Sequence, residues 1–277
     1  MKNRLYLLLL FPGLILLIIF LVIPLFNTLF PTVYDNGFSL SKYIDFLKDE
    51  YYLTILMRTL KISIISTIVC IILGTPTAYY ISRCDKKWRS LLIAISIFPL
   101  LTNSVVRSFA WINILGKNGV INTLLMKIGL IKEPITLLYT EFSIIIGTIY
   151  LFLPLMIITV VGVMENIDND MMEAAESLGA NRITAFLKVV LPMSLPGIIV
   201  GGVLVFTGAL TAYTTPQLLG GNKNLVLATF IYQKAMSVGD WTGASVIATI
   251  MIIITVLVIK ILNGVAVKLD KRGEDYA

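Results

Sequence analysis

Long apolar runs alternate with short polar connections along the 277 residues of this chain. A helix needs about 20 consecutive apolar residues to cross the hydrocarbon core of a bilayer, and six runs reach that length. We expect membrane spans at residues 5–30, 60–82, 91–115, 142–164, 192–216 and 244–266. Helices are the expected form, because backbone polar groups in lipid must be bonded within their own segment. The pattern predicts an all-α polytopic membrane protein, with one transmembrane domain over residues 1–277 and six transmembrane helices.

The basic residues predict how these spans are oriented. The short connection between the second and third spans contains four cations: Arg83, Lys86, Lys87 and Arg89. Short loops rich in Lys and Arg remain in the cytoplasm. This rule places both termini and the polar segment 165–191 in the cytoplasm. The first span resembles a signal peptide, but its apolar length and the lack of a small-residue cleavage site favour a retained membrane anchor.

Composition excludes several classes of function. The chain is 57% hydrophobic and 14% charged, with a net charge of +6, no histidine and two cysteines. The absence of histidine excludes a histidine-based catalytic triad or zinc site. The basic residues mostly flank apolar spans, which indicates membrane orientation rather than nucleic-acid binding. No phosphate-binding G-x-x-x-x-G-K-[ST] loop is present. We therefore expect no catalytic residue, no metal and no cofactor on this chain, and any ATP to be bound by another subunit.

The polar segment 165–191 has the pattern of two short helices separated by a break. Asp170 is a suitable N-cap for the first helix, and Gly179 suits the left-handed position that ends it. Asn181 can cap a second helix, which Pro192 should stop. Such signals also occur in an ordinary surface hairpin, so local pattern alone leaves both interpretations open.

The residues of this segment resemble a known motif. Glu-Ala-Ala, three residues, Gly, nine residues, Val189, one residue and Leu-Pro is similar to the EAA loop of ATP-binding-cassette (ABC) importer permeases, which usually have Ile at the position of Val189. The resemblance implies the six-span fold of type I ABC importer permeases. It also implies that the loop docks into a cytoplasmic ATPase. The residues that it assigns to this contact are Glu173, Ala174, Ala175, Leu178, Gly179, Arg182, Leu191 and Pro192.

The resemblance also implies a set of partners. These are a dimer of the cytoplasmic ABC ATPase, a second permease that is a different homologous chain, and an extracytoplasmic solute-binding protein. A small solute would pass between the two permeases in the cell membrane, surrounded by membrane lipid. The chain itself would not be an enzyme.

The fifth span and its surroundings suggest a translocation pathway. A stripe of glycines in this span, Gly197 to Gly208, suits close packing, either within the chain or with another subunit. The outer half of the span is rich in hydroxyl groups, which indicates a watery cavity rather than lipid. Arg107 lies about 24 Å along the third span, near the outer boundary, where it can snorkel outward or pair with Glu141. The candidate pathway residues are Arg107, Thr211, Tyr213, Thr215, Gln217, Asp240 and Trp241.

Within the permease family, residues 102–107, 215–221, 240–241 and 244–245 resemble the spermidine/putrescine group. Gln217 stands where some polyamine permeases have an acidic residue. Permeases for phosphonate, iron or similar solutes share variants of these stretches and remain alternatives. An ion-coupled secondary transporter usually carries intramembrane acids or histidines, which the spans here almost lack. A structural scaffold would not explain the two-helix polar loop.

Overall fold

The computed structural model describes residues 11–34, 37–168 and 170–269, with side chains up to Gly264. Regular structure in the described residues is helical, apart from one isolated bridge between Tyr34 and Phe38. The chain forms two compact units. Unit 1 combines Met1–Thr54 with Phe230–Ile252, and unit 2 combines Ile55–Thr229 with Ile253–Ala277.

Unit 1 is built from the ends of several helices. It contains η1 (Ile18–Val22), α2 (Ile23–Val33), α3 (Ser41–Lys48), the first turn of α4 (Glu50–Ser82), the end of α14 (Leu227–Tyr232), η3 (Gln233–Val238) and the start of α15 (Trp241–Leu269). Its interior is aromatic. Phe46 is buried, and its ring centroid lies 5.3 Å from that of Tyr52, which is 5.2 Å from that of Phe230.

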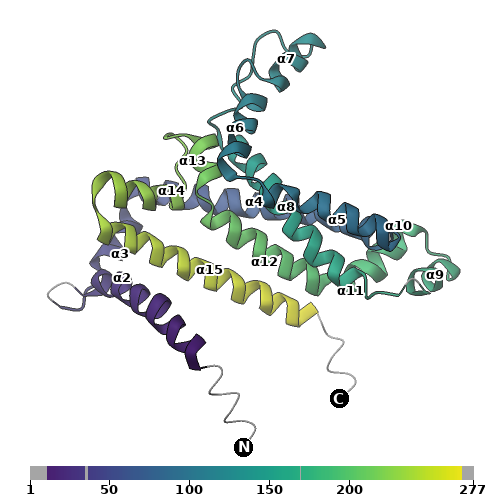
Figure 1. The fold of residues 1–277 in the computed structure, drawn as a ribbon, viewed down its shortest axis with the longest axis horizontal. Coiled ribbons are helices and arrows are strands. Elements are labelled where there is room, and N and C mark those ends of the chain that lie inside the picture. The colour runs from purple at the N-terminus through teal and green to yellow at the C-terminus, as the bar shows by residue number, and fades with distance from the viewer. Residues whose placement is uncertain (1–10, 35–36, 169, 270–277) are drawn as a thin grey trace, which may run out of the picture. The chain divides into compact units, whose positions relative to one another are not determined.

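Unit 2 is organised around α8 (Glu141–Met164), which contacts α5, α6, α12 and α13 (Figure 1). Unit 2 also contains most of α4, the start of α14 and the end of α15. Its other elements are α5 (Lys86–Leu101), α6 (Ser104–Leu115), α7 (Val120–Lys127), α9 (Asp170–Ser177), α10 (Arg182–Ala185), η2 (Phe186–Val190), α11 (Leu191–Met193), α12 (Leu195–Thr211) and α13 (Thr214–Gly220). Its core contains buried residues of α4, α8 and α12, including Cys70, Met156, Val160 and Val205.

The glycine stripe of α12 packs against α8 within the chain. A Cβ on Gly197 would lie 2.7 Å from Val163 Cγ2, and one on Gly201 would lie 2.6 Å from Met156 Sδ. A Cβ on Gly208 would collide with the ring of Phe152. The stripe therefore lets the backbone of α12 approach α8 closely, as small residues do between membrane helices. Of the two roles considered for it, packing within the chain is the one that these contacts show.

Within the described part of the chain, four helical segments are long and apolar enough to cross a membrane, and up to six if each of two sharply bent helix pairs counts as one span. The predicted fourth span, 142–164, agrees with α8 to within one residue. The first span is described from Phe11 to Val33, while predicted residues 5–10 lie outside the described part. The second and sixth spans begin earlier than expected, at Glu50 and Trp241.

The third and fifth spans differ from the single helices that we predicted. The third is broken between α5 and α6, which meet at 93°. Thr102 is extended there, and Asn103 Oδ1 accepts hydrogen bonds from the N–H groups of Val105 and Val106. This N-cap starts a new helix in a new direction. The fifth is a short helix, α12, that ends at Thr211 and meets the preceding segment Arg182–Met193 at 69°.

Candidate functional site

The first half of the predicted coupling loop folds as the sequence indicated. Helix α9 is followed by Gly179, whose φ of +90° lies in the left-handed region. The turn closes with hydrogen bonds from Gly179 N to Glu176 O (2.9 Å) and from Ala180 N to Ala175 O (3.1 Å). These bonds satisfy carbonyls that the helix end would leave open. Asp170 is the first residue of α9 rather than its cap, and the residue before it is outside the described part.

The second half begins at the predicted cap but ends later than expected. Asn181 Oδ1 accepts a hydrogen bond from Thr184 N at 2.8 Å. The helical segment then continues through α10, η2 and α11 to Met193, beyond Pro192. Residues 186–190 form a π-helical turn just before the proline. Such a widened turn shifts the hydrogen-bond pattern, so the missing N–H of Pro192 does not break the helix there.

The inner side of this loop is fixed to the core of unit 2. Met172, Phe186 and Leu191 pack against the buried cluster that includes Met164 and Val190. The apolar faces of α9 and of the helical segment that follows Gly179 are therefore buried in the same core, which holds both in place. Leu191, one of the predicted coupling residues, thus anchors the loop rather than lying on its outer face.

Two arginines of the basic turn bind the root of the loop. Arg83 Nη1 donates to Ile167 O at 2.9 Å. Arg89 Nη2 donates to Ser82 O at 2.8 Å, at the end of α4, and its Nη1 lies 3.5 Å from Glu165 Oε1. Sequence reasoning assigned these cations only to membrane orientation. The structure shows in addition that the basic turn and the loop lie at the same end of unit 2.

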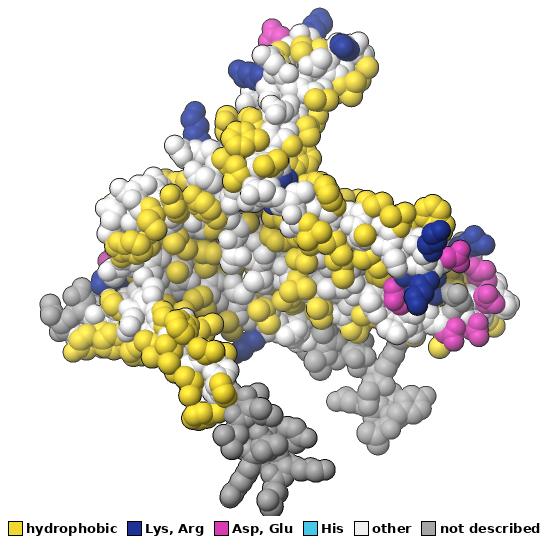
Figure 2. Space-filling model, in the orientation of Figure 1, with side chains coloured by type: hydrophobic (Ala, Val, Ile, Leu, Met, Phe, Trp, Pro, Cys, Tyr) yellow, Lys and Arg dark blue, Asp and Glu magenta, His cyan; other side chains and the backbone are white. Residues whose placement is uncertain are grey.

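The outer side of the loop exposes both apolar and charged side chains. Leu178 is 89% exposed and Ile183 is 72% exposed, so two large apolar side chains project from the elbow. Arg182 Nε lies 3.8 Å from Glu176 Oε1. Charged side chains of both signs gather at this end of unit 2, at the right of Figure 2. A cavity of about 540 Å³ opens between the loop and α4, lined by Tyr79, Arg83, Met172, Glu173, Glu176, Arg182, Ile183 and Phe186.

Of the other predicted coupling residues, Glu173 and Ala174 are exposed on α9, whereas Ala175 is half-buried. Pro192 is half-buried within the helical segment. Glu173 and Ala174 are therefore open to a partner, as are the exposed Leu178 and Arg182.

Arg107 takes neither of the two roles predicted for it. It is 8% exposed, and its Nη1 donates to Pro99 O in the last turn of α5 and to Thr102 O at the C-cap of that helix. A cation at a helix C-terminus satisfies open carbonyls and the helix dipole. Arg107 therefore stabilises the bend between α5 and α6. Glu141 instead binds two cations of α4, Arg58 at 3.2 Å and Lys61 at 2.8 Å.

The candidates of the fifth span lie around the break between α12 and α13. Thr211 is exposed, and its hydroxyl donates to Thr207 O at 2.9 Å. Tyr213 and Gln217 are half-buried. Thr215 is buried, with its methyl group against Gly147 of α8, so it packs the helices together and does not face open space.

Asp240 and Trp241 belong to unit 1, whereas the other pathway candidates belong to unit 2. Asp240 caps α15, accepting a hydrogen bond from Gly243 N at 2.7 Å, and lies 3.3 Å from Lys234 Nζ. Trp241 is 62% exposed at the start of the last span. These contacts give Asp240 a structural role within unit 1.

Residues 70–272 match the family described as binding-protein-dependent transport system inner membrane component. The chain belongs to this family. It is thus a multi-pass membrane permease of the ABC importer type, and its relatives are transport components rather than enzymes.

Three comparisons set the permease among its relatives. The spermidine/putrescine transport system permease protein PotB of Haemophilus influenzae is 35% identical over 213 residues, covering 77% of this chain and 74% of that protein. A bacterial ABC transporter that imports the acidic polysaccharide alginate has a subunit with a TM-score of 0.82 at 19% identity, covering 98% of this chain and 97% of that one. A second structure of the alginate transporter, in complex with an alginate pentasaccharide-bound periplasmic protein, also has a similar subunit. Its TM-score is 0.80 at 19% identity, covering 98% of this chain and 96% of that one. These structures confirm the fold of the permease.

Proposed function

We propose that this permease forms half of the translocation pathway of a polyamine importer, which carries spermidine or putrescine into the cell. The observation that carries this proposal is the 35% identity with the H. influenzae spermidine/putrescine permease over most of both chains. Gln217, half-buried beside the α12–α13 break, stands where some polyamine permeases carry an acid. The binding protein would therefore carry most of the charge recognition.

The loop between α8 and α12 is the proposed docking element for the ATPase. Its inner face is buried in the core, and its outer face presents Glu173, Leu178 and Ile183 to solvent. Exposed apolar side chains rimmed by charge are typical of a protein–protein contact. ATP would be bound and hydrolysed by the cytoplasmic ATPase dimer. The basic turn at the same end of unit 2 supports a cytoplasmic position for the loop and for both termini.

The contacts of the loop suggest how docking acts on the pathway. Arg83 and Arg89 join its root to the turn between α4 and α5. Helix α5 then leads to the bend that Arg107 stabilises. A rigid helix that is tied at one end and bent at the other can transmit a displacement of the loop to the segment around residue 102.

The proposed partners are a second, homologous permease and an extracytoplasmic solute-binding protein. The alginate transporter was solved in complex with its periplasmic protein, which supports an assembly of this kind for the present chain. The solute would pass between the two permeases.

The test is uptake by the complete importer reconstituted in proteoliposomes with its binding protein. We expect uptake of radiolabelled spermidine or putrescine that requires both ATP and the binding protein. Uptake of a phosphonate or an iron complex, with neither polyamine transported, would overturn the substrate. Uptake by the permease without the ATPase, driven by an ion gradient, would instead favour a secondary transporter.

A further inference from the structure

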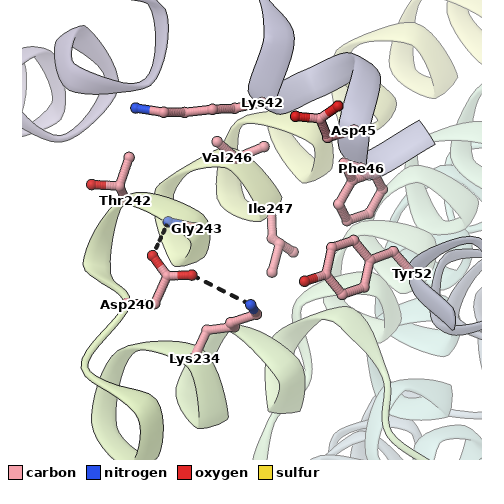
Figure 3. A pocket seen from close by; sticks show the side chains of 10 residues that line it. All are labelled: Lys42, Asp45, Phe46, Tyr52, Lys234, Asp240, Thr242, Gly243, Val246 and Ile247. Atoms are coloured by element: carbon pink, nitrogen blue, oxygen red, sulfur yellow. Dashed lines mark hydrogen bonds and ion pairs between the residues drawn. The ribbon is translucent and has the colours of Figure 1, made fainter. Parts of the chain in front are cut away.

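Unit 1 contains a pocket of about 310 Å³ that the transport function above does not use (Figure 3). It lies between α3, the first turn of α4 and the segment from η3 to the start of α15. Its base is apolar, formed by the buried side chains of Phe46, Val246 and Ile247. Its edge is charged, with two lysines and two aspartates.

One charged pair at the edge is fixed. Lys234 Nζ lies 3.3 Å from Asp240 Oδ2, and Asp240 Oδ1 accepts the hydrogen bond from Gly243 N (Figure 3). The ammonium of Lys234 also lies 5.3 Å from the ring centroid of Tyr52. A hydrogen bond with Tyr52 is the largest cause that raises the pKa of Lys234, so this lysine stays charged. The pair closes one side of the pocket and leaves no net charge there.

The second pair lies on α3. Lys42 and Asp45 both line the pocket, and Asp45 is exposed. Among the described residues, no hydrogen bond or ion pair involves the Asp45 carboxylate. Lys42 Nζ donates to Pro31 O at 3.3 Å, which places it beside the end of α2. The pocket thus carries a cation and an anion three residues apart on α3, whose side chains point in different directions above an apolar base (Figure 3).

The pocket lies where membrane spans end. The first span ends at Val33, α4 begins at Glu50 and the last span begins at Trp241. Exposed aromatic side chains mark these ends, namely Tyr34, Tyr51 and Trp241. Tyrosine and tryptophan are enriched at the membrane–water interface. A bilayer headgroup is therefore at the right depth to enter the pocket.

Below this level, α2 presents an apolar surface. Phe26, Phe30 and Tyr34 are exposed and stack in sequence, with centroid distances of 5.3 and 5.2 Å. Helix α3 is joined to the end of α2 by the hydrogen bond between Thr32 Oγ1 and Tyr43 Oη, at 2.6 Å. Acyl chains can lie along this surface while their headgroup reaches α3.

We propose that this pocket binds the zwitterionic headgroup of a phosphatidylethanolamine-type lipid, with its ammonium at Asp45 and its phosphate at Lys42. A primary ammonium donates hydrogen bonds to a carboxylate, and a phosphate accepts them from an ammonium. A zwitterion matches the neutral sum of the four lining charges. A polycation such as spermidine would meet two lysines, and an anionic lipid without an ammonium would leave Asp45 unmatched.

The test is native mass spectrometry of the complete importer, purified from a mixture of phosphatidylethanolamine, phosphatidylcholine and phosphatidylglycerol. We expect selective retention of phosphatidylethanolamine, because the choline headgroup has no N–H donor and the glycerol headgroup has no cation. Asp45→Asn and Lys42→Gln should each reduce retention about fivefold to tenfold, as expected for one charge-assisted hydrogen bond at a partly exposed site. Lys48→Gln is the matched control, since Lys48 ends the same helix and does not line the pocket.

Several results would overturn the proposal. These are equal retention of the three lipids, unchanged retention in both pocket variants, or the same loss in Lys48→Gln. Occupation by free phosphoethanolamine or spermidine in the delipidated importer, with no return of lipid when it is added back, would show a site for a soluble ligand instead. Complex yield measured beside retention separates a lost lipid from a lost fold.

Discussion

A substitution at Gly179, the elbow between the two helices of the proposed coupling loop, tests the role of this loop most sharply. Gly179 has a φ of +90°, and a Cβ added to it would meet no atom within 4 Å. A substitution there therefore costs backbone strain alone, without a steric clash. That strain is about 1–2 kcal/mol for an ordinary L-residue and is larger for a β-branched one. We expect Gly179→Val to turn the second helix away from its present direction and to abolish uptake.

The chain supplies two matched controls. Gly129 has a φ of +75° and equally open surroundings, but it lies after α7, away from the loop. Gly129→Val therefore introduces comparable strain and should leave uptake near that of the unmodified permease. Gly179→Asn should retain most of the activity, because asparagine tolerates the left-handed region better than valine does.

The assay measures uptake, membrane abundance and ATPase retained on the purified permease for the three variants. The expected result is loss of uptake and of ATPase retention for Gly179→Val alone, with normal abundance of all three. Full ATPase retention with normal uptake in Gly179→Val would refute the reasoning. Equal loss in Gly129→Val would show that strain anywhere in the chain, and not the direction of the elbow, causes the defect.

Three further predictions concern the rest of unit 2 and the orientation of the chain. Arg89→Gln should lower uptake about 5–30-fold, the factor for 1–2 kcal/mol, while the ATPase stays bound and hydrolyses ATP; Lys87→Gln, in the same turn, should leave uptake unchanged. Gly208→Leu should lower the thermal midpoint of the purified permease, because its side chain would collide with Phe152 and overpacking costs about 1–3 kcal/mol. A membrane-impermeant thiol reagent applied outside should label Lys42→Cys and spare Lys87→Cys, and the reverse labelling would contradict the topology.

Part of the proposed coupling loop could be predicted because two of its signals are local, whereas Asp170 is not the predicted cap and Pro192 does not end the second helix. Gly179 takes the left-handed turn and Asn181 caps the second helix, as their residue types indicated. The fourth span was also predicted within one residue, since one uniform apolar run corresponds to one helix. Local backbone chemistry and long apolar runs are therefore readable without tertiary information.

The bent spans could not be predicted in the same way. The break between α5 and α6 falls at a short polar stretch, residues 102–104, inside a longer apolar run. Such a stretch does not by itself specify a 93° turn. Asn103 carried the missing signal, as a residue suited to cap a helix within an apolar stretch. The partner of Arg107 was unpredictable for a related reason. Pro99 O and Thr102 O come within its reach only because α5 and α6 meet at a sharp angle there.

The roles of Arg83 and Arg89 depended on tertiary contacts as well. Their positive charge sufficed to predict the orientation of the membrane spans. Their contacts with Ile167 O and Glu165 join segments that lie about 80 residues apart in the sequence. Sequence reasoning could therefore identify the loop but not the side chains that fix it to the neighbouring helices.

The central claim is that the elbow of this loop contacts the ATPase, and site-specific photo-crosslinking tests it most directly. A photoreactive amino acid replaces Leu178, which is 89% exposed at the elbow, in the complete importer. The control position is Leu130, which is also exposed but follows α7. The account predicts a covalent product with the ATPase from position 178 and none from position 130. No product from position 178 in an importer that transports normally would contradict it.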